Sequence, residues 1–173
     1  MSRMPNVILF LSLGAILASC TFTYTPPQDI TAAPYVNSIQ SKLSEPIRVE
    51  DATAPDTVIA SRMLYFTINA NLSAFGAAVT ASLERQLVKN GFRVTTDATK
   101  EIRIDVIDVE MAYPKHYRCD IELAVRVGEK TVGIATDSTV SMVYTDAIDD
   151  AIADAVRRIL THPAVVAYLK SDQ

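Results

Sequence analysis

Two stretches in the second half of the chain, in which apolar and polar residues alternate, restrict its fold more than any other feature. Residues 119–127 have an apolar residue at every odd position, while Asp120, Glu122 and Arg126 fall between them. Residues 102–111 alternate in the same way but change phase once. A period of two is typical of strands with one buried side. The change of phase indicates either a β-bulge or a strand that is buried on both faces.

The residues around these stretches predict an antiparallel sheet. Gly128 opens a short turn, and residues 131–144 return with apolar side chains in phase, interrupted by a polar bend at residues 137–139. Residues 113–116 break the chain between the two alternating stretches, and the turn at residues 128–130 makes residues 119–127 and 131–144 a hairpin. Further short strands are predicted at residues 47–51, 63–68 and 92–96, with a turn at residues 53–56.

Two amphipathic helices accompany the strands. In the first, Asn71 or Ser73 is suited to cap the amino end and Gly91 to end the helix. The second spans residues 146–160, and Thr145, or Asp146 with Asp149, is a candidate cap. The apolar residues at spacing four that predict the first helix are Phe75, Val79, Leu83 and Leu87.

The order of these elements predicts an α+β fold. A mostly antiparallel sheet would carry the two main helices packed on one face. Residues 47–173, about 127 in number, would form a single domain, which is large enough to bury an ordinary core.

Residues 1–19 are predicted to be a signal peptide. Arg3 precedes an apolar run at residues 7–18. As a helix this run would span about 18 Å, well short of a hydrocarbon core of about 30 Å, so a membrane-spanning helix is not expected. A charged start followed by a short apolar stretch is typical of secretory signals.

The end of this segment, Leu17-Ala18-Ser19-Cys20, resembles the lipobox of bacterial lipoproteins. The resemblance implies transfer of diacylglycerol to the sulfur of Cys20, cleavage between Ser19 and Cys20, and acylation of the new amino terminus. Thr21 stands where an Asp in enterobacterial lipoproteins signals retention in the inner membrane, so the resemblance favours the periplasmic face of the outer membrane. The alternatives are a plain signal peptide with a chance cysteine and a buried N-terminal helix.

Residues 20–46 are predicted to be the lipidated cysteine and a flexible tether. Four of the eight prolines lie in this range, and Pro-rich chain is extended by about 3.1 Å per residue. Such a tether would lift the domain away from the membrane.

Residues 78–94 form an amphipathic helix that passes through Gly91-Phe92 into a strand, and they resemble YajG-type bacterial lipoproteins. The predicted hairpin and closing helix continue the resemblance. It implies a small envelope lipoprotein and supplies no catalytic motif. The same helix-Gly-Phe-strand pattern is also similar to the auxiliary lipoproteins of lipid-transporting ABC systems.

The composition argues against several classes of function. Lys and Arg number 16 against 20 Asp and Glu, a net charge of -4, whereas nucleic-acid binding requires a basic face. None of the five glycines belongs to a phosphate-binding motif, and two His with two Cys leave little for a zinc site. No cofactor, no metal and no enzymatic activity are therefore expected.

Three groups of residues are candidate reactive sites. His116 and Cys119 could form a nucleophilic pair, but the phase of Cys119 favours a buried core position. Acidic residues on the predicted strands are explained more simply by a solvated face than by acid-base chemistry or calcium binding. The same holds for the Asp residues of the second helix, of which the first three suit a helix amino end. The acidic residues concerned are Asp105, Asp108, Glu110 and Asp137, and Asp146, Asp149, Asp150 and Asp154.

Tyr113, Tyr117 and Tyr144 are spaced to meet near one end of the hairpin and are candidates for a partner or ligand surface, with core packing as the alternative.

The predicted function is that of a non-enzymatic outer-membrane lipoprotein. Its periplasmic domain would bind another envelope protein. One alternative is an auxiliary subunit of a lipid-transporting ABC system, and the other is a periplasmic enzyme.

Overall fold

The computed structural model describes residues 20–24, 26, 45–62, 66–113, 116–137 and 139–171. The larger sheet has five strands in the order β2-β5-β6-β7, with β8 also paired to β6. The smaller sheet has the order β1-β4-β3. The strands are β1 Cys20–Tyr24, β2 Ile47–Asp51, β3 Thr57–Arg62, β4 Phe66–Asn71, β5 Lys100–Ala112, β6 Tyr117–Val127, β7 Lys130–Ala135 and β8 Thr139–Ser141, and the helices are α1 Leu72–Lys89, α2 Tyr144–Thr161 and α3 Pro163–Lys170.

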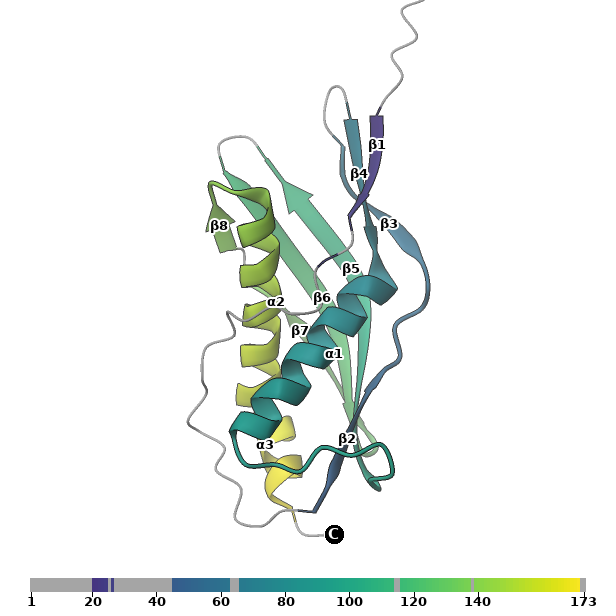
Figure 1. The fold of residues 1–173 in the computed structure, drawn as a ribbon, viewed down its shortest axis with the longest axis vertical. Helices are drawn as coiled ribbons and strands as arrows, with labels where there is room; N and C mark the ends of the chain where they lie inside the picture. Colours follow the sequence, from purple (N-terminus) through teal and green to yellow (C-terminus); the bar gives the residue numbers. More distant parts are fainter. Residues whose placement is uncertain are drawn as a thin grey trace, which may run out of the picture.

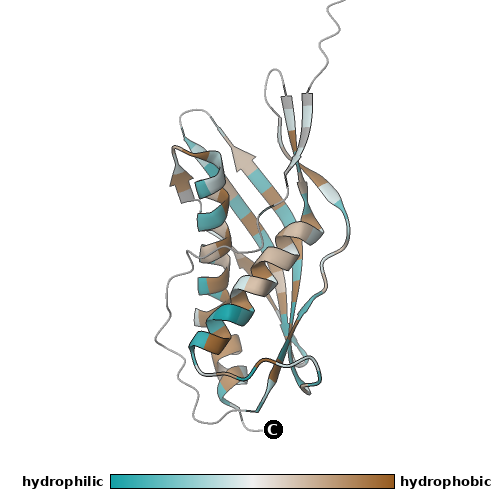
Figure 2. Ribbon diagram, in the orientation of Figure 1, coloured by the Kyte–Doolittle hydropathy of each residue, from teal (hydrophilic) through white to brown (hydrophobic). Residues whose placement is uncertain are grey.

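Helices α1 and α2 lie on one face of the larger sheet, and α3 follows the end of α2 (Figure 1). The core lies between these two layers. Each layer contributes buried side chains to it: Phe75 and Leu83 from α1, Ile152 and Ile159 from α2, and all the odd-numbered residues of β6 from Cys119 on. Apolar and polar residues alternate along β5 and β6 (Figure 2). The predicted α+β class, with two main helices on one face of a mostly antiparallel sheet, is confirmed.

The change of phase in β5 is a β-bulge. The register between β5 and β6 shifts between Val106 and Asp108, so Ile107 is the extra residue. Its side chain is about half exposed, whereas Val106 and Val109 on either side are buried. The bulge brings both halves of the strand onto the same core, and the alternative of burial on both faces is wrong.

Helix α1 has the predicted ends. The side chain of Asn71 accepts a hydrogen bond of 3.2 Å from the backbone N–H of Ala74, and Gly91 adopts a left-handed conformation with φ of 86°. Gly76 lets the helix approach the chain after β2, because a Cβ at this position would collide with Thr53 and Asp51.

The smaller sheet was only partly predicted. A strand was expected at residues 63–68, but the described residues form the hairpin of β3 and β4, with a register shift between Ile59 and Ser61. Strand β1 pairs in parallel with β4, with Cys20 opposite Phe66. The predicted tether is therefore corrected for residues 20–24, which belong to the sheet. Most of its remainder, and the signal peptide, lie outside the described residues.

Two other predicted strands differ from the structure. Residues 92–96 make a single bridge, between Val94 and Ile47, instead of a strand. Residues 131–144 are divided into β7 and β8, and Val140 and Met142, which were expected on the buried side, are exposed. The division follows the polar residues that begin at Thr136: β7 ends at Ala135, and β8 pairs with β6 again from Thr139, further along β6.

The second helix begins two residues earlier than predicted, at Tyr144, and its N-cap is Val143, which makes no side-chain capping hydrogen bond. The predicted caps at Thr145, or Asp146 with Asp149, are therefore wrong. Among the described residues, no helix combines the length and the apolar composition needed to cross a membrane.

The C-terminal helix α3 is fastened to β5 by a buried lysine. The Lys100 ammonium donates hydrogen bonds to the carbonyl oxygens of Leu169, at 3.5 Å, and Ser171, and lies 5.3 Å from the centre of the Tyr168 ring. The Tyr168 hydroxyl accepts a hydrogen bond of 2.9 Å from the backbone N–H of Glu101. These contacts satisfy the end of α3 and bind it to the sheet.

Candidate functional site

The predicted lipidation residue, Cys20, is the first residue of β1. Its backbone pairs with Phe66 of β4, and Thr21 pairs with Thr67. Strand β1 lies at one end of the long axis of the molecule and the C-terminus at the other (Figure 1). Ser19, on the other side of the predicted cleavage point, lies outside the described residues.

The three predicted tyrosines meet at the same end of the domain. The ring of Tyr117 stacks on Tyr113, with centroids 4.9 Å apart, and meets Tyr144 edge-on at 5.6 Å. Tyr117 and Tyr144 pack against the core, and the Tyr144 hydroxyl donates to the sulfur of Met111 at 3.1 Å. Tyr113 is half exposed. The cavity beside the cluster has a volume of only about 10 Å³, so what it offers a partner is the surface of Tyr113.

Cys119 and His116 are not arranged as a nucleophilic pair. Burial raises the pKa of the Cys119 thiol to about 12, and the carboxylate of Asp120 acts in the same direction. A thiol of this kind is protonated at neutral pH and is a poor nucleophile. His116 is exposed, and its Nδ1 lies 2.9 Å from the sulfur of Met142.

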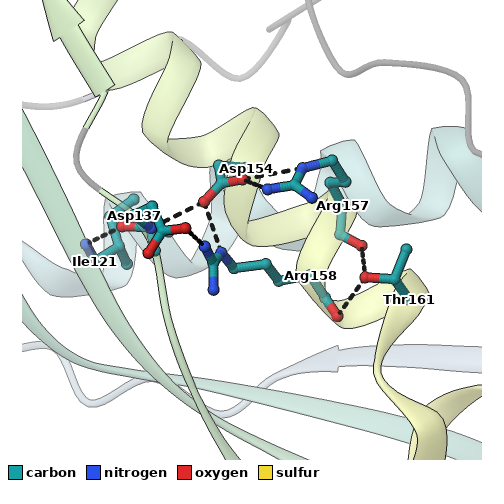
Figure 3. A network of polar contacts seen from close by, with 7 residues as sticks. Ile121, Asp137, Asp154, Arg157, Arg158 and Thr161 are labelled. Carbon is teal, nitrogen blue, oxygen red and sulfur yellow. Dashed lines mark hydrogen bonds and ion pairs between the residues drawn. The ribbon is translucent and has the colours of Figure 1, made fainter.

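An ionic network on α2 was not predicted from the sequence. The carboxylate of Asp154 accepts hydrogen bonds from Nε of Arg157 at 3.0 Å, Nε of Arg158 at 2.8 Å and the backbone N–H of Asp137 at 3.0 Å (Figure 3). Arg158 also pairs with Asp137. The neighbouring Thr136 hydroxyl accepts a hydrogen bond of 2.8 Å from the backbone N–H of Ile121. The network thus ties α2 to the chain that follows β7.

Asp154 differs from the other Asp residues of its helix. Its side chain is only 10% exposed, so the prediction that it shares a solvated side with Asp146 and Asp150 is wrong. Burial alone would raise the pKa of Asp154, but the hydrogen bonds from Arg158 and Arg157 outweigh this effect and hold the pKa below its ordinary value. Within the described part of the chain, no group of three or more His, Cys, Asp or Glu residues is placed to bind a metal.

A groove of about 640 Å³ separates β3 from the second half of β5. Its walls are two strands that do not pair with each other, since β3 pairs with β4 and β5 pairs with β6. The backbone N–H of Val109 donates a hydrogen bond of 2.9 Å to the carboxylate of Asp108. Ile59 and Glu110 also line the groove and are exposed.

A second groove of about 550 Å³ lies between the last turns of α1 and the start of β2. Val49, Val88 and Val94 give it an apolar floor, and Val88 is 57% exposed. Three basic residues and one acidic residue line it as well: Arg48, Arg85, Lys89 and Glu84. This groove is the more apolar of the two.

No protein-family model matches the sequence, and no curated protein matches it. The chain is similar to the crystal structure of protein XCC0632 from Xanthomonas campestris, a DUF330 protein, at 17% identity and a TM-score of 0.49 over 87% of this chain and 93% of that chain. It is also similar to the crystal structure of an uncharacterized protein at 11% identity and a TM-score of 0.47 over 82% and 97% of the two chains. The resemblance to YajG-type lipoproteins stays a prediction.

Proposed function

We propose that the chain is a non-enzymatic lipoprotein, anchored by lipid on Cys20 at the periplasmic face of the outer membrane, whose domain binds another component of the cell envelope. The position of Cys20 carries the proposal. The last residue of the lipobox-like motif is also the first residue of β1. A lipid on its sulfur would be joined to the folded sheet, and two or more acyl chains hold a protein stably on a membrane.

The groove between β3 and β5 supports the binding part of the proposal. Among the described residues, β3 and the second half of β5 are each paired on one side only, and free strand edges recognise extended segments by adding a strand. Asp108 and Glu110 line it and are exposed, so the segment that fits best is extended and carries basic side chains. The proposed partner is therefore an envelope protein with an extended basic segment.

Metabolic labelling with palmitate tests the anchor. The full-length protein is expected to incorporate the label and to fractionate with outer membranes, while Cys20→Ser incorporates none. Cys119→Ala is the matched control, because it removes the other cysteine and should keep the label. Equal labelling of the wild type and Cys20→Ser would refute the anchor.

Photo-crosslinking in intact cells tests the partner. A photoreactive amino acid at Ser61, in the groove, is expected to form adducts that mass spectrometry maps to an extended basic segment. The same group at Thr131, exposed on β7, should not form them. Glu110→Lys should reduce the adducts, whereas Glu129→Lys, in the exposed turn after β6, should leave them unchanged. Adducts that are equal at both positions, or unaffected by Glu110→Lys, would refute the groove as the binding site.

The second candidate function is that of an auxiliary subunit in lipid transport, which the groove beside α1 favours. An apolar floor with basic residues at its rim suits an acyl chain with a phosphate headgroup. Lipid bound to the protein after its purification in detergent, and lost from Val88→Asp, would support this function. An equal lipid content in the wild type and the variant would argue against it.

A further inference from the structure

Four exposed apolar side chains lie near the end of the domain at which β1 begins. We call them the anchor-end surface: Tyr113, Val140, Met142 and Val143. They are between 50% and 75% exposed, and Met142 is the most exposed of them. Tyr113 directly follows β5, Val140 lies in β8, and the other two lie between β8 and α2. The end of β5, β8, the start of α2 and β1 all lie at the same end of the long axis (Figure 1).

Two residues of the anchor-end surface, Tyr113 and Met142, contact residues of neighbouring elements. Tyr113 stacks on Tyr117, which in turn contacts Tyr144 at the start of α2. His116 contacts the sulfur of Met142 at 2.9 Å, which joins the chain after β5 to the chain after β8. These aromatic and sulfur contacts connect Tyr113 to β6 and to the start of α2, and connect Met142 to the residue that precedes β6.

Strand pairing connects this surface to the anchor. Phe22 of β1 lies opposite Ile68 of β4, and Ile68 lines a small cavity together with Met111 and Tyr117. Cys20 lies two residues before Phe22, a distance of about 7 Å along a strand. The residue predicted to carry the lipid therefore lies at the amino end of a strand whose partner, β4, contributes Ile68 to the cavity beside the tyrosine cluster.

We propose that the anchor-end surface rests in the headgroup region of the membrane leaflet that holds the lipid of Cys20, with α3 and the C-terminus directed away from it. The inference rests on the proposed anchor and extends it to an orientation. Since β1 begins at Cys20, the acyl chains enter the leaflet beside this surface, and the domain has no free chain by which to move away. The leaflet is therefore its nearest apolar neighbour.

The chemistry of the surface fits this occupant. Tyrosine is enriched at membrane interfaces, where its ring is buried and its hydroxyl stays hydrated. Apolar side chains of a protein that lies on a membrane enter about 5–10 Å into the boundary between headgroups and acyl chains. Asp146, exposed in the first turn of α2, adds negative charge at this end. Zwitterionic lipids therefore fit the surface better than anionic ones.

The sequence contains no tryptophan, so the Trp fluorescence of a variant with one introduced Trp comes from that position alone. The Met142→Trp variant of the full-length lipidated protein is placed in phosphatidylcholine vesicles with or without bromine on the acyl chains. The matched control is Glu129→Trp, in the exposed turn after β6, where the neighbouring Gly128 lies close to Tyr168 of α3. Bromine is expected to remove most of the fluorescence of Met142→Trp and to leave Glu129→Trp unchanged. Tyr113→Trp is a second reporter, to be used if Met142→Trp does not fold.

Intact mass separates the two ways in which this experiment can fail. A protein without the lipid mass on Cys20 would refute the proposed anchor, and the inference with it. A lipidated protein whose Met142→Trp and Tyr113→Trp fluorescence is the same in both vesicles would refute the inference alone. Quenching of Glu129→Trp only would overturn the orientation. Protection of Met142→Trp that depends on protein concentration would indicate that a second copy covers the surface in place of the leaflet.

Discussion

Replacing Asp154 by Asn tests whether the network on α2 stabilises the fold. The carboxylate accepts hydrogen bonds from Arg158, Arg157 and the backbone N–H of Asp137, at 2.8–3.0 Å. Hydrogen bonds to charged groups contribute about 1.5–3 kcal/mol each where they are buried. Arg157 is 44% exposed and can regain water, whereas Arg158 is 28% exposed. We therefore expect Asp154→Asn to lower the free energy of unfolding by about 2–3 kcal/mol. The contacts with Arg158 and with the N–H of Asp137 should supply most of this loss, because solvent weakens the contact with the more exposed Arg157.

Urea denaturation followed by circular dichroism measures this loss. With an m value of about 2 kcal/mol per M, the midpoint should fall by about 1–1.5 M at pH 7. Asp150→Asn, an exposed site one turn earlier on the same helix, is the matched control and should change the free energy by about 0.5 kcal/mol or less. Equal midpoints for the two variants would refute the assignment of Asp154 as a stabilising residue.

The same variant predicts a pH dependence. The pKa of Asp154 in the folded protein lies below its ordinary value. The stability it contributes is therefore fully present above the unfolded pKa of about 3.9 and is lost as the pH falls through the lower folded pKa. The difference between the wild type and Asp154→Asn should be constant from pH 7 to about pH 5 and shrink below about pH 4. A difference that persists unchanged at the acid end would contradict the ionic explanation.

Three further predictions follow from burial. Leu83→Ala removes a fully buried side chain of α1 and should lower the free energy of unfolding, measured by urea denaturation, by about 2–5 kcal/mol. Glu84→Ala, at the partly exposed neighbouring position, should lower it by about 0.5 kcal/mol or less. Equal losses would mean that the apolar face of α1 is misassigned. Cys119 should resist a bulky thiol reagent at pH 8 until denaturant is added, because its pKa is about 12, and rapid labelling of the native protein would contradict this. Lys100→Met should speed hydrogen exchange in α3 through loss of the bond to Leu169, and unchanged exchange would show that the apolar contacts of α3 suffice.

The parts of the fold that sequence reasoning predicts are those fixed by local patterns. The spacing from Phe75 to Leu87 predicts α1, and its caps at Asn71 and Gly91 follow from side-chain chemistry and glycine conformation. The phase change around Ile107 predicts either a bulge or burial on both faces, because each residue of a strand must face one side or the other, and the structure shows the bulge. Such signals lie within a few residues of the element they define.

The parts that were missed depend on partners distant in the sequence. The pairing of Cys20 with Phe66 joins residues 46 positions apart. Thr21 to Tyr24 are residue types that favour strands, but nothing in the local sequence indicates the strand with which they pair. Asp154 is predicted to be a solvated charge, and the local sequence gives Lys100 no role. Only the fold brings the N–H of Asp137 to Asp154 and the carbonyl of Leu169 to Lys100. The tyrosine cluster is predicted from the sequence, since Tyr117 and Tyr144 lie at the open end of the predicted hairpin and Tyr113 lies just before it.

The parallel pairing of β1 with β4 has a mechanical consequence. A pull on a lipid at Cys20 acts along the axis of β1 when the rest of the domain is held back. The five residues of β1, paired from Cys20 to Tyr24, would then be loaded together in shear, and their hydrogen bonds could not open one after another as they do when a hairpin is peeled apart. A chain attached to a membrane in this way would resist extraction through its first strand, and β4 would pass the force on to α1, which follows it without a gap.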